Sequence, residues 1–294
     1  MRTISEDRLA ALLGAIPGTP RVVASGNFAT PWCALSALDA AVAEYRLFML
    51  NAQAGVPARD GVTLETPFVG PGMRGRPGLR YFPCRLSLVP VLLSEALPPD
   101  IVLVQTSAPA GGTVSLGTEV NVLPAAIEAA RTRGGLIIAQ VNRCVPYTYG
   151  DGVLATDDID YAIEADIPLP SPAARPAAEA FALIGERVAA LVGDGATLQL
   201  GIGAVPDAVL AALTGRRGLR VWSEMFSDGV LALDKGGALD PSTQVTGSFA
   251  FGSAELYDWM DRNPGIRMLR TETVNDPALI ARHRHQCGEF APLV

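Results

Sequence analysis

Two features of this chain have residue types and a spacing that could support chemistry: a glycine turn and a glutamate that follows it. The run Asp194–Pro206 reads as a strand ending at Leu200, a turn containing Gly201 and Gly203, and a helix opening at Pro206. Glycines let backbone N–H groups approach a ligand, and N–H groups at the start of a helix favour an anion. The next predicted strand ends within the run Val221–Glu224. Neighbouring parallel strands end at one edge of a sheet, so we expect Glu224 beside this turn.

The residues alone leave two chemistries open. In one, the turn binds a dinucleotide and Glu224, 23 positions after Gly201 (224 − 201), holds a ribose hydroxyl. Pro206 stands where that fingerprint has its third glycine, which makes this signal weak. In the other, Glu224 attacks a thioester carbonyl and the turn amides stabilise the oxyanion. The alternative to both chemistries is that Glu224 is a solvated carboxylate with no functional role and that the turn is only structural.

Five segments together are more specific than the turn. Gln199–Val209 and Glu224–Gly229 closely resemble the acetyl-CoA hydrolase/transferase family, which includes the acetate and 4-hydroxybutyrate CoA-transferases. Ser107–Gly117, Gly252–Pro264 and Val274–Pro277 resemble it as well. The likeness extends to about Arg282.

This resemblance implies a class I CoA-transferase mechanism, in which Glu224 passes through a glutamyl-CoA thioester. It implies that Gly203, Ala204 and Val205 form the oxyanion loop, and that Gly201 and Asn275 lie near the bound coenzyme. Acyl-CoA and a short carboxylic acid are the expected partners, with water as acceptor in a hydrolase. CoA would be a substrate, and no metal is expected.

The chain also departs from the family pattern. The family continues well beyond Val274–Pro277, so we expect a chain that is truncated relative to it. Tyr147 stands where the family usually has arginine, and Ala110-Gly111 where an acidic residue and a histidine are common. These departures motivate an alternative hypothesis: a catalytically degenerate CoA-binding or assembly protein.

Composition narrows the class of protein. A chain that is 49% hydrophobic but only 6% aromatic suits parallel strands buried on both faces. The net charge is -7 and the sequence has no dense run of Lys and Arg, which argues against binding to nucleic acid. No apolar segment reaches the length of a bilayer span, and scattered cysteines indicate reduced thiols. We therefore expect a cytoplasmic protein with no membrane role. Two histidines, His283 and His285, give little material for a metal site or a Ser–His–Asp triad.

Short apolar runs alternate with helix-like stretches along the chain, which predicts an α/β fold with parallel strands. A proline-rich segment, Asp166–Pro172, reads as a linker. We expect two open parallel-sheet domains of the CoA-transferase type: residues 1–170, and residues 171–294 carrying Glu224, with the second sheet incomplete. An unfinished sheet edge favours a homo-oligomer. The expected elements are strands at 21–24, 45–50, 101–104, 136–139, 196–200 and 219–222, and helices at 123–133, 177–192 and 206–213.

Overall fold

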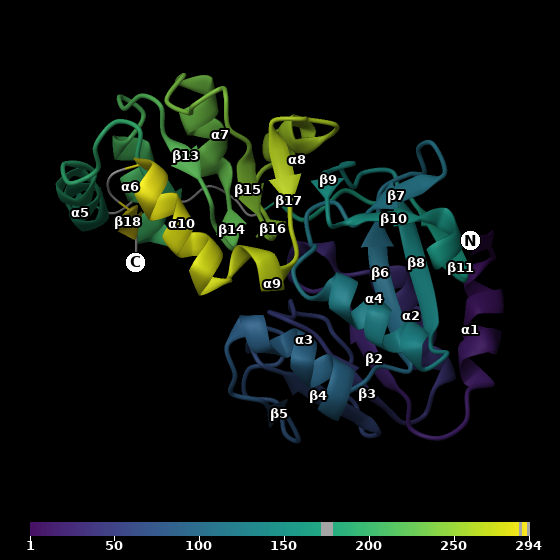
Figure 1. Ribbon diagram of the computed structural model, residues 1–294. Coiled ribbons are helices and arrows are strands. Elements are labelled where there is room, and N and C mark those ends of the chain that lie inside the picture. Colours follow the sequence, from purple (N-terminus) through teal and green to yellow (C-terminus); the bar gives the residue numbers. More distant parts are fainter. Residues whose placement is uncertain (172–178, 288–289, 293–294) are drawn as a thin grey trace. The chain divides into compact units, whose positions relative to one another are not determined.

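The computed structural model describes residues 1–171, 179–287 and 290–292, with side chains described through Arg282 (Figure 1). The chain forms two compact units. Unit 1 comprises Met1–Tyr147 and Asp151–Leu169, and unit 2 comprises Thr148–Gly150 and Pro170–Val294. The proline-rich segment predicted as a linker contains this boundary, and its last residue, Pro172, lies outside the described residues.

Unit 1 is built on an eight-stranded parallel sheet with the order β1-β11-β8-β6-β2-β3-β4-β5. A small antiparallel pair, β7 and β10, lies outside it. The strands of unit 1 are β1 Arg2–Thr3, β2 Arg21–Ala24, β3 Tyr45–Phe48, β4 Val62–Thr66, β5 Arg80–Tyr81, β6 Ile101–Thr106, β7 Thr113–Ser115, β8 Leu136–Asn142, β10 Val153–Ala155 and β11 Tyr161–Ala165. Its helices are α1 Glu6–Gly14, η1 Asn27–Ala29, α2 Trp32–Ala41, η2 Leu86–Leu88, α3 Val89–Val91, η3 Leu92–Ala96, α4 Leu123–Thr132 and η4 Thr156–Asp158.

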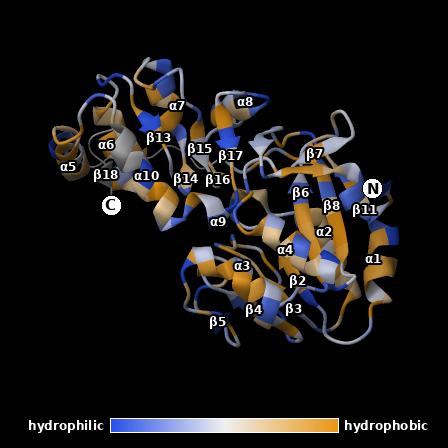
Figure 2. Cartoon of the chain, viewed as in Figure 1, coloured by the Kyte–Doolittle hydropathy of each residue, from blue (hydrophilic) through white to orange (hydrophobic). Residues whose placement is uncertain are grey.

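The central strands of unit 1 are fully buried because helices cover a parallel sheet on both faces. Every residue of β2 and β6 is buried, and β6 and β8 carry hydrophobic colour along much of their length (Figure 2). The chain runs from β2 to β3 on one side and returns to β6 on the other. The sheet order therefore reverses beside β2, which is the kind of position where open α/β sheets bind ligands.

Unit 2 repeats the parallel architecture with shorter strands. Two three-stranded groups, β13-β12-β18 and β15-β17-β9, are joined by a bridge between Trp222 and Thr246, and β14 pairs with β16. The strands are β9 Tyr149–Gly150, β12 Thr197–Gln199, β13 Arg220–Val221, β14 Met225–Phe226, β15 Val245–Gly247, β16 Phe249–Ala250, β17 Ile266–Met268 and β18 Phe290–Pro292. The helices are α5 Glu179–Ala189, α6 Ala204–Ala212, α7 Asp228–Lys235, α8 Ala254–Met260, α9 Thr271–Val274 and α10 Pro277–Cys287.

The predicted α/β class is confirmed, and the predicted strands appear with ends that match or shift by up to three residues. Helix α6 begins at Ala204, two residues before the predicted start at Pro206, because Pro206 is tolerated within a first turn whose N–H groups have no intrahelical partner. Helix α5 ends at Ala189; residues 177–178 of the predicted helix lie outside the described ranges.

Candidate active site

The glycine turn and Glu224 are joined through the strands that carry them. Strands β12 and β13 pair in parallel, with Thr197 opposite Arg220. Beyond the pair, the Ser223 hydroxyl accepts a hydrogen bond from the Leu200 N–H at 2.9 Å and donates to the Leu200 carbonyl at 3.2 Å. Leu200 directly precedes Gly201, so the residue before the turn is tied to the residue before Glu224. Ser223 was not singled out from the sequence, although its place directly before Glu224 was the available signal.

The turn presents free backbone donors. Gly203 precedes α6 with φ 123° and ψ -176°, a conformation essentially restricted to glycine. The Gly203 carbonyl accepts a hydrogen bond from the Asp207 N–H at 3.2 Å. By contrast, no described residue accepts a hydrogen bond from the N–H groups of Ala204 and Val205. Ala204 is exposed and Val205 is half-buried. Two amides at the positive end of a nine-residue helix therefore remain available to an anion.

Glu224 is half-buried, and its backbone is fixed by the neighbouring segment. Its carbonyl accepts hydrogen bonds from the N–H groups of Ser248 and Phe249 at 2.9 and 3.1 Å. In the side chain, Oε2 accepts from Asn275 Nδ2 at 2.7 Å. The other oxygen, Oε1, has no partner in the described part of the chain and is not among the buried unpaired atoms there. One carboxylate oxygen is thus held, and the other is accessible.

The environment acts on the Glu224 carboxyl in two opposing ways. Desolvation by burial raises its pKa, and the hydrogen bond from Asn275 lowers it, leaving the pKa above its usual value. The Asn275 amide therefore stabilises the ionised form, which is the form able to act as a nucleophile.

Asn275 follows the last residue of α9, and its backbone N–H donates to the Thr271 carbonyl at 2.9 Å. The next two residues start α10. Asp276 Oδ1 accepts from the Ala278 N–H at 2.7 Å, and Pro277 is the first helical residue. The structure therefore brings Asn275 to Glu224 across 51 positions of sequence, while its predicted place near bound CoA stays a prediction.

A second polar contact links the two helices that flank the site. Ser227 Oγ lies 3.5 Å from Asp207 Oδ1, between the segment before α7 and the first turn of α6. Burial raises the pKa of Asp207, with Asp228 adding to the rise and Ser227 opposing it. Asp228 in turn accepts from the Ser253 N–H and hydroxyl at the start of α8.

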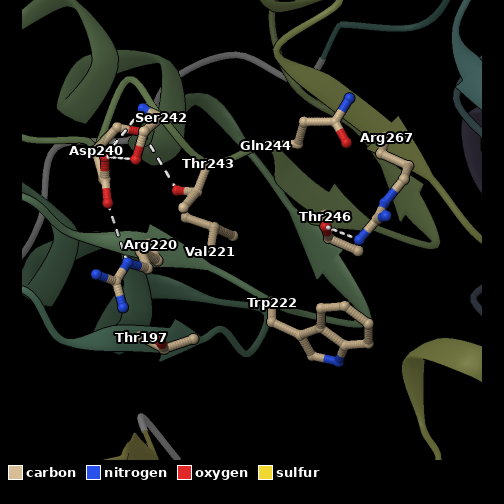
Figure 3. A pocket seen from close by; sticks show the side chains of 10 residues that line it. All are labelled: Thr197, Arg220, Val221, Trp222, Asp240, Ser242, Thr243, Gln244, Thr246 and Arg267. Carbon is tan, nitrogen blue, oxygen red and sulfur yellow. Dashed lines mark hydrogen bonds and ion pairs between the residues drawn. The ribbon is translucent and has the colours of Figure 1, made fainter. Parts of the chain in front are cut away.

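A cavity of about 450 Å³ lies beside the strands of unit 2 (Figure 3). Strands β12, β13, β15 and β17 contribute to its lining, and the lining residues Thr197, Val221 and Thr246 are buried. Arg220 pairs with Asp240 at 3.1 Å there, so this arginine is occupied by a surface ion pair. The cavity is lined by Thr197, Arg220, Val221, Trp222, Asp240, Ser242, Thr243, Gln244, Thr246 and Arg267.

The described residues hold no cluster of three or more His, Cys, Asp or Glu side chains arranged to bind a metal ion. His283 and His285 lie in α10, beyond the last described side chain. Within the described ranges, no helix has both the length and the hydropathy that a bilayer crossing requires.

The chain is similar to CoA-transferases of known sequence and structure. Residues 252–288 match the acetyl-CoA hydrolase/transferase C-terminal domain. The 4-hydroxybutyrate coenzyme A transferase of Clostridium kluyveri is 38% identical over 211 residues, which cover 69% of this chain and 48% of that protein. The chain spans about half the length of the curated relatives it matches.

The fold of this chain is also similar to solved structures, over nearly its whole length. RipA from Yersinia pestis superposes with a TM-score of 0.87 at 24% identity, over 96% of this chain and 71% of that one. The 4-hydroxybutyrate CoA-transferase of Porphyromonas gingivalis superposes with a TM-score of 0.80 at 30% identity, over 95% of this chain and 70% of that one. By sequence and by fold together, the chain belongs to the acetyl-CoA hydrolase/transferase family.

Proposed function

We propose that this chain catalyses acyl-CoA:carboxylate CoA transfer, of the acetate or 4-hydroxybutyrate type, or acyl-CoA hydrolysis, with Glu224 as the covalent nucleophile. One observation carries the proposal. Glu224 has one oxygen bound to Asn275 at 2.7 Å and the other without a described partner, and it follows Ser223, which is tied to the residue before the glycine turn. The names of the relatives support the same reaction class.

In the proposed reaction, a Glu224 oxygen attacks the thioester carbonyl carbon of an acyl-CoA. The C–S bond breaks, CoA leaves as a thiolate, and a mixed anhydride forms on Glu224. The thiolate then attacks the glutamyl carbonyl, and the acyl group leaves as a free carboxylate. This leaves a glutamyl-CoA thioester. An acceptor carboxylate reverses the sequence with a new acyl group, whereas water releases CoA and completes a hydrolysis.

The turn would stabilise the charge that develops during each attack. Negative charge collects on the carbonyl oxygen, and N–H groups of the Gly203–Val205 turn are the proposed donors. Their place at the start of α6 adds the positive end of the helix. Gly201 would let the coenzyme approach the backbone, since it has no side chain to obstruct it.

The substrate part of the proposal is CoA with a short carboxylic acid, and CoA is a substrate and not a resident cofactor. Tyr147 and Ala110 differ from the family pattern at positions where carboxylate recognition is expected. We also propose a cytoplasmic homo-oligomer. The free thiols of Cys33, Cys84 and Cys144 support the cytoplasmic part of this proposal.

Covalent trapping tests the proposal. The protein is incubated with acetyl-CoA and digested, and the peptide containing Glu224 is analysed by mass spectrometry. A coenzyme adduct on Glu224 is expected, and hydroxylamine or borohydride should trap it as the hydroxamate or the alcohol. Glu224→Gln should give no adduct, while Glu255→Gln, which changes an exposed carboxylate of α8, should retain it.

The alternative of a catalytically degenerate protein predicts a different result. Such a protein would gain thermal stability with CoA yet form no adduct and release no product. A folded wild-type chain that gives neither an adduct nor stabilisation by CoA contradicts both hypotheses. Saturable NAD binding without competition from CoA would instead favour the dinucleotide hypothesis.

A further inference from the structure

The side chain of Trp222 anchors the end of a helix that is too short to hold itself. Its indole Nε1–H donates to the Val274 carbonyl at 3.0 Å, and the ring is 7% exposed. Val274 is the last residue of α9, which has only four residues. A helix of this length is not stable alone, and its last carbonyls have no intrahelical donor. The indole N–H supplies the missing donor.

Packing around the ring reinforces this contact. Trp222, Leu269 and Val274 form a separate small apolar cluster, against which Leu279 and Ile280 of α10 pack. The Arg267 guanidinium carbon lies 5.9 Å from the centre of the indole ring, a cation–π arrangement. Figure 3 shows the ring at the edge of the cavity described above. Because this cavity borders Trp222, the ring has space to shift if its hydrogen bond is lost.

The residue after Val274 is Asn275, whose amide holds Glu224 Oε2. Trp222 and Glu224 are two positions apart in the segment between β13 and β14, so that segment makes two bonds to successive residues at the end of α9. Together these two bonds connect the segment that carries Glu224 to the end of α9. Asn275 can keep its amide on the carboxylate only while the end of α9 stays in place.

We propose that Trp222 is a positioning residue for the reaction: its indole N–H fixes the end of α9 and thereby keeps the Asn275 amide on the Glu224 carboxylate. This inference rests on the proposed function of Glu224. The effect of Trp222 on the Glu224 carboxyl can be measured whether or not catalysis occurs.

Losing the indole donor should affect the carboxyl in a defined direction. The hydrogen bond from Asn275 opposes the rise in the Glu224 pKa that burial causes. If the end of α9 moves, this opposition weakens and the pKa rises further. Less of the carboxylate is then ionised at a given pH, and its reaction with acyl-CoA slows. Loss of one hydrogen bond corresponds to about a fivefold effect.

The test is a titration of Glu224 by NMR in protein labelled with ¹³C at the glutamate carboxyl, with the signal assigned by comparison with Glu224→Gln. Three variants are compared with the wild type: Trp222→Phe, Asn275→Ala and the double variant. Trp222→Phe keeps an apolar ring and removes the N–H. We expect Trp222→Phe to raise the pKa of Glu224 in the same direction as Asn275→Ala, and the double variant to show no further rise.

Two further variants separate positioning from simple packing. Trp259→Phe removes an indole N–H bonded to Asp234 at 2.9 Å elsewhere in unit 2, and it should leave the Glu224 titration unchanged. Trp222→His keeps a ring N–H and should recover part of the shift. An unchanged titration in Trp222→Phe, or fully additive shifts in the double variant, overturns the inference. If Trp222→Phe does not fold, a Glu224 pKa shift in Trp222→His that is smaller than the shift in Asn275→Ala supports the inference, and an equal or larger shift overturns it.

A failure of the proposed function has a different signature. In that case the wild-type protein forms no adduct with acetyl-CoA, but the titrations still report whether Trp222 acts on Glu224. If Glu224 is the nucleophile and Trp222 positions it, adduct formation in Trp222→Phe should be about fivefold slower than in wild type. The acidic limb of the pH–rate profile of this variant should also move to higher pH.

Discussion

Each unit of this molecule holds a glutamate by asparagine amides, and the two arrangements differ in access. In unit 1, Glu119 is 2% exposed; Asn27 Nδ2 lies 2.9 and 2.8 Å from its two oxygens, and Asn121 Nδ2 lies 2.6 Å from one. In unit 2, Glu224 has one asparagine donor and an accessible second oxygen. A fully enclosed carboxylate organises the chain around it, whereas a half-enclosed one can meet a substrate.

The backbone around the two sites differs in a related way. Asn27, Asn51 and Asn121 all have positive φ, and Asn51 donates to the Asn27 side chain at 2.6 Å. Asparagine tolerates this conformation and can also hydrogen-bond. In unit 2, the positive φ in the turn before α6 falls on Gly203, which has no side chain and leaves its surroundings open. Unit 1 thus combines conformation with side-chain bonding, while unit 2 keeps the space free.

The largest expected effect is the loss of activity when the accessible carboxylate, Glu224, is replaced. Glu224→Gln removes the nucleophile but keeps the shape, so CoA transfer or hydrolysis should fall by about a thousandfold or more. Thermal unfolding should show little change, since the side chain is only half-buried. Steady-state assay with acetyl-CoA measures the rate. Retention of wild-type turnover would contradict the assigned nucleophile.

Glu119→Met should instead destabilise unit 1 without touching the nucleophile. It leaves the buried amides of Asn27 and Asn121 without their acceptor, and we expect a loss of about 3 kcal/mol in the free energy of unfolding. Urea denaturation measures this loss. Glu128→Met, on the exposed side of α4, is the control and should stay within about 0.5 kcal/mol of wild type.

The pH dependence of stability should carry the signature of Glu119. Burial raises its pKa from 4.5 to about 7, against the opposing hydrogen bonds from Asn27, Asn121 and the Gly26 backbone. The folded state therefore binds a proton more tightly than the unfolded state, and stability falls as pH rises from about 4.5 to about 7.

The size of this fall is at most about 3 kcal/mol. Urea unfolding of wild type and Glu119→Gln at several pH values isolates it, because the glutamine mimics the protonated acid and should lack this component. Parallel curves for the two proteins would show that Glu119 is ionised normally in the folded state.

A pair of glycines tests the backbone part of the comparison. Gly203→Ala should cost about 2 kcal/mol, because φ 123° strains any residue with a Cβ. Gly193 also has open space around it but has no positive φ. Gly193→Ala should therefore be neutral or slightly stabilising. Equal effects at the two positions would mean that the turn relaxes without strain.

The smallest expected effect concerns the single amide on Glu224. Asn275→Ala should slow adduct formation about tenfold and move the acidic limb of the pH–rate profile to higher pH, since the pKa of Glu224 rises without its donor. Asn263→Ala, at an asparagine that bonds only nearby backbone in the described part of unit 2, is the matched control. An unmoved limb would show that Asn275 does not influence ionisation.

Sequence reasoning found features that local pattern encodes. Apolar runs such as Arg21–Ala24 and Leu136–Ala139 became strands, and the α/β class followed from their alternation with helices. Gly203 and Glu224 were recognisable because the segments Gln199–Val209 and Glu224–Gly229 resemble the acetyl-CoA hydrolase/transferase family. The Glu119 cluster gave no such signal, because Asn27 lies 92 positions from Glu119 and asparagine is ordinary in loops.

By itself, the sequence determined the order of the elements, the glycine turn and the residue that could act as a nucleophile, since each depends on neighbours within a few positions. Tertiary structure decided which carboxylate is enclosed and which is accessible. It also decided that Trp222 bonds to Val274 and Glu224 to Asn275, two successive residues at the end of α9. Hydrogen bonds and burial act over a few ångströms in space, and only the folded chain brings residues some fifty positions apart to that distance.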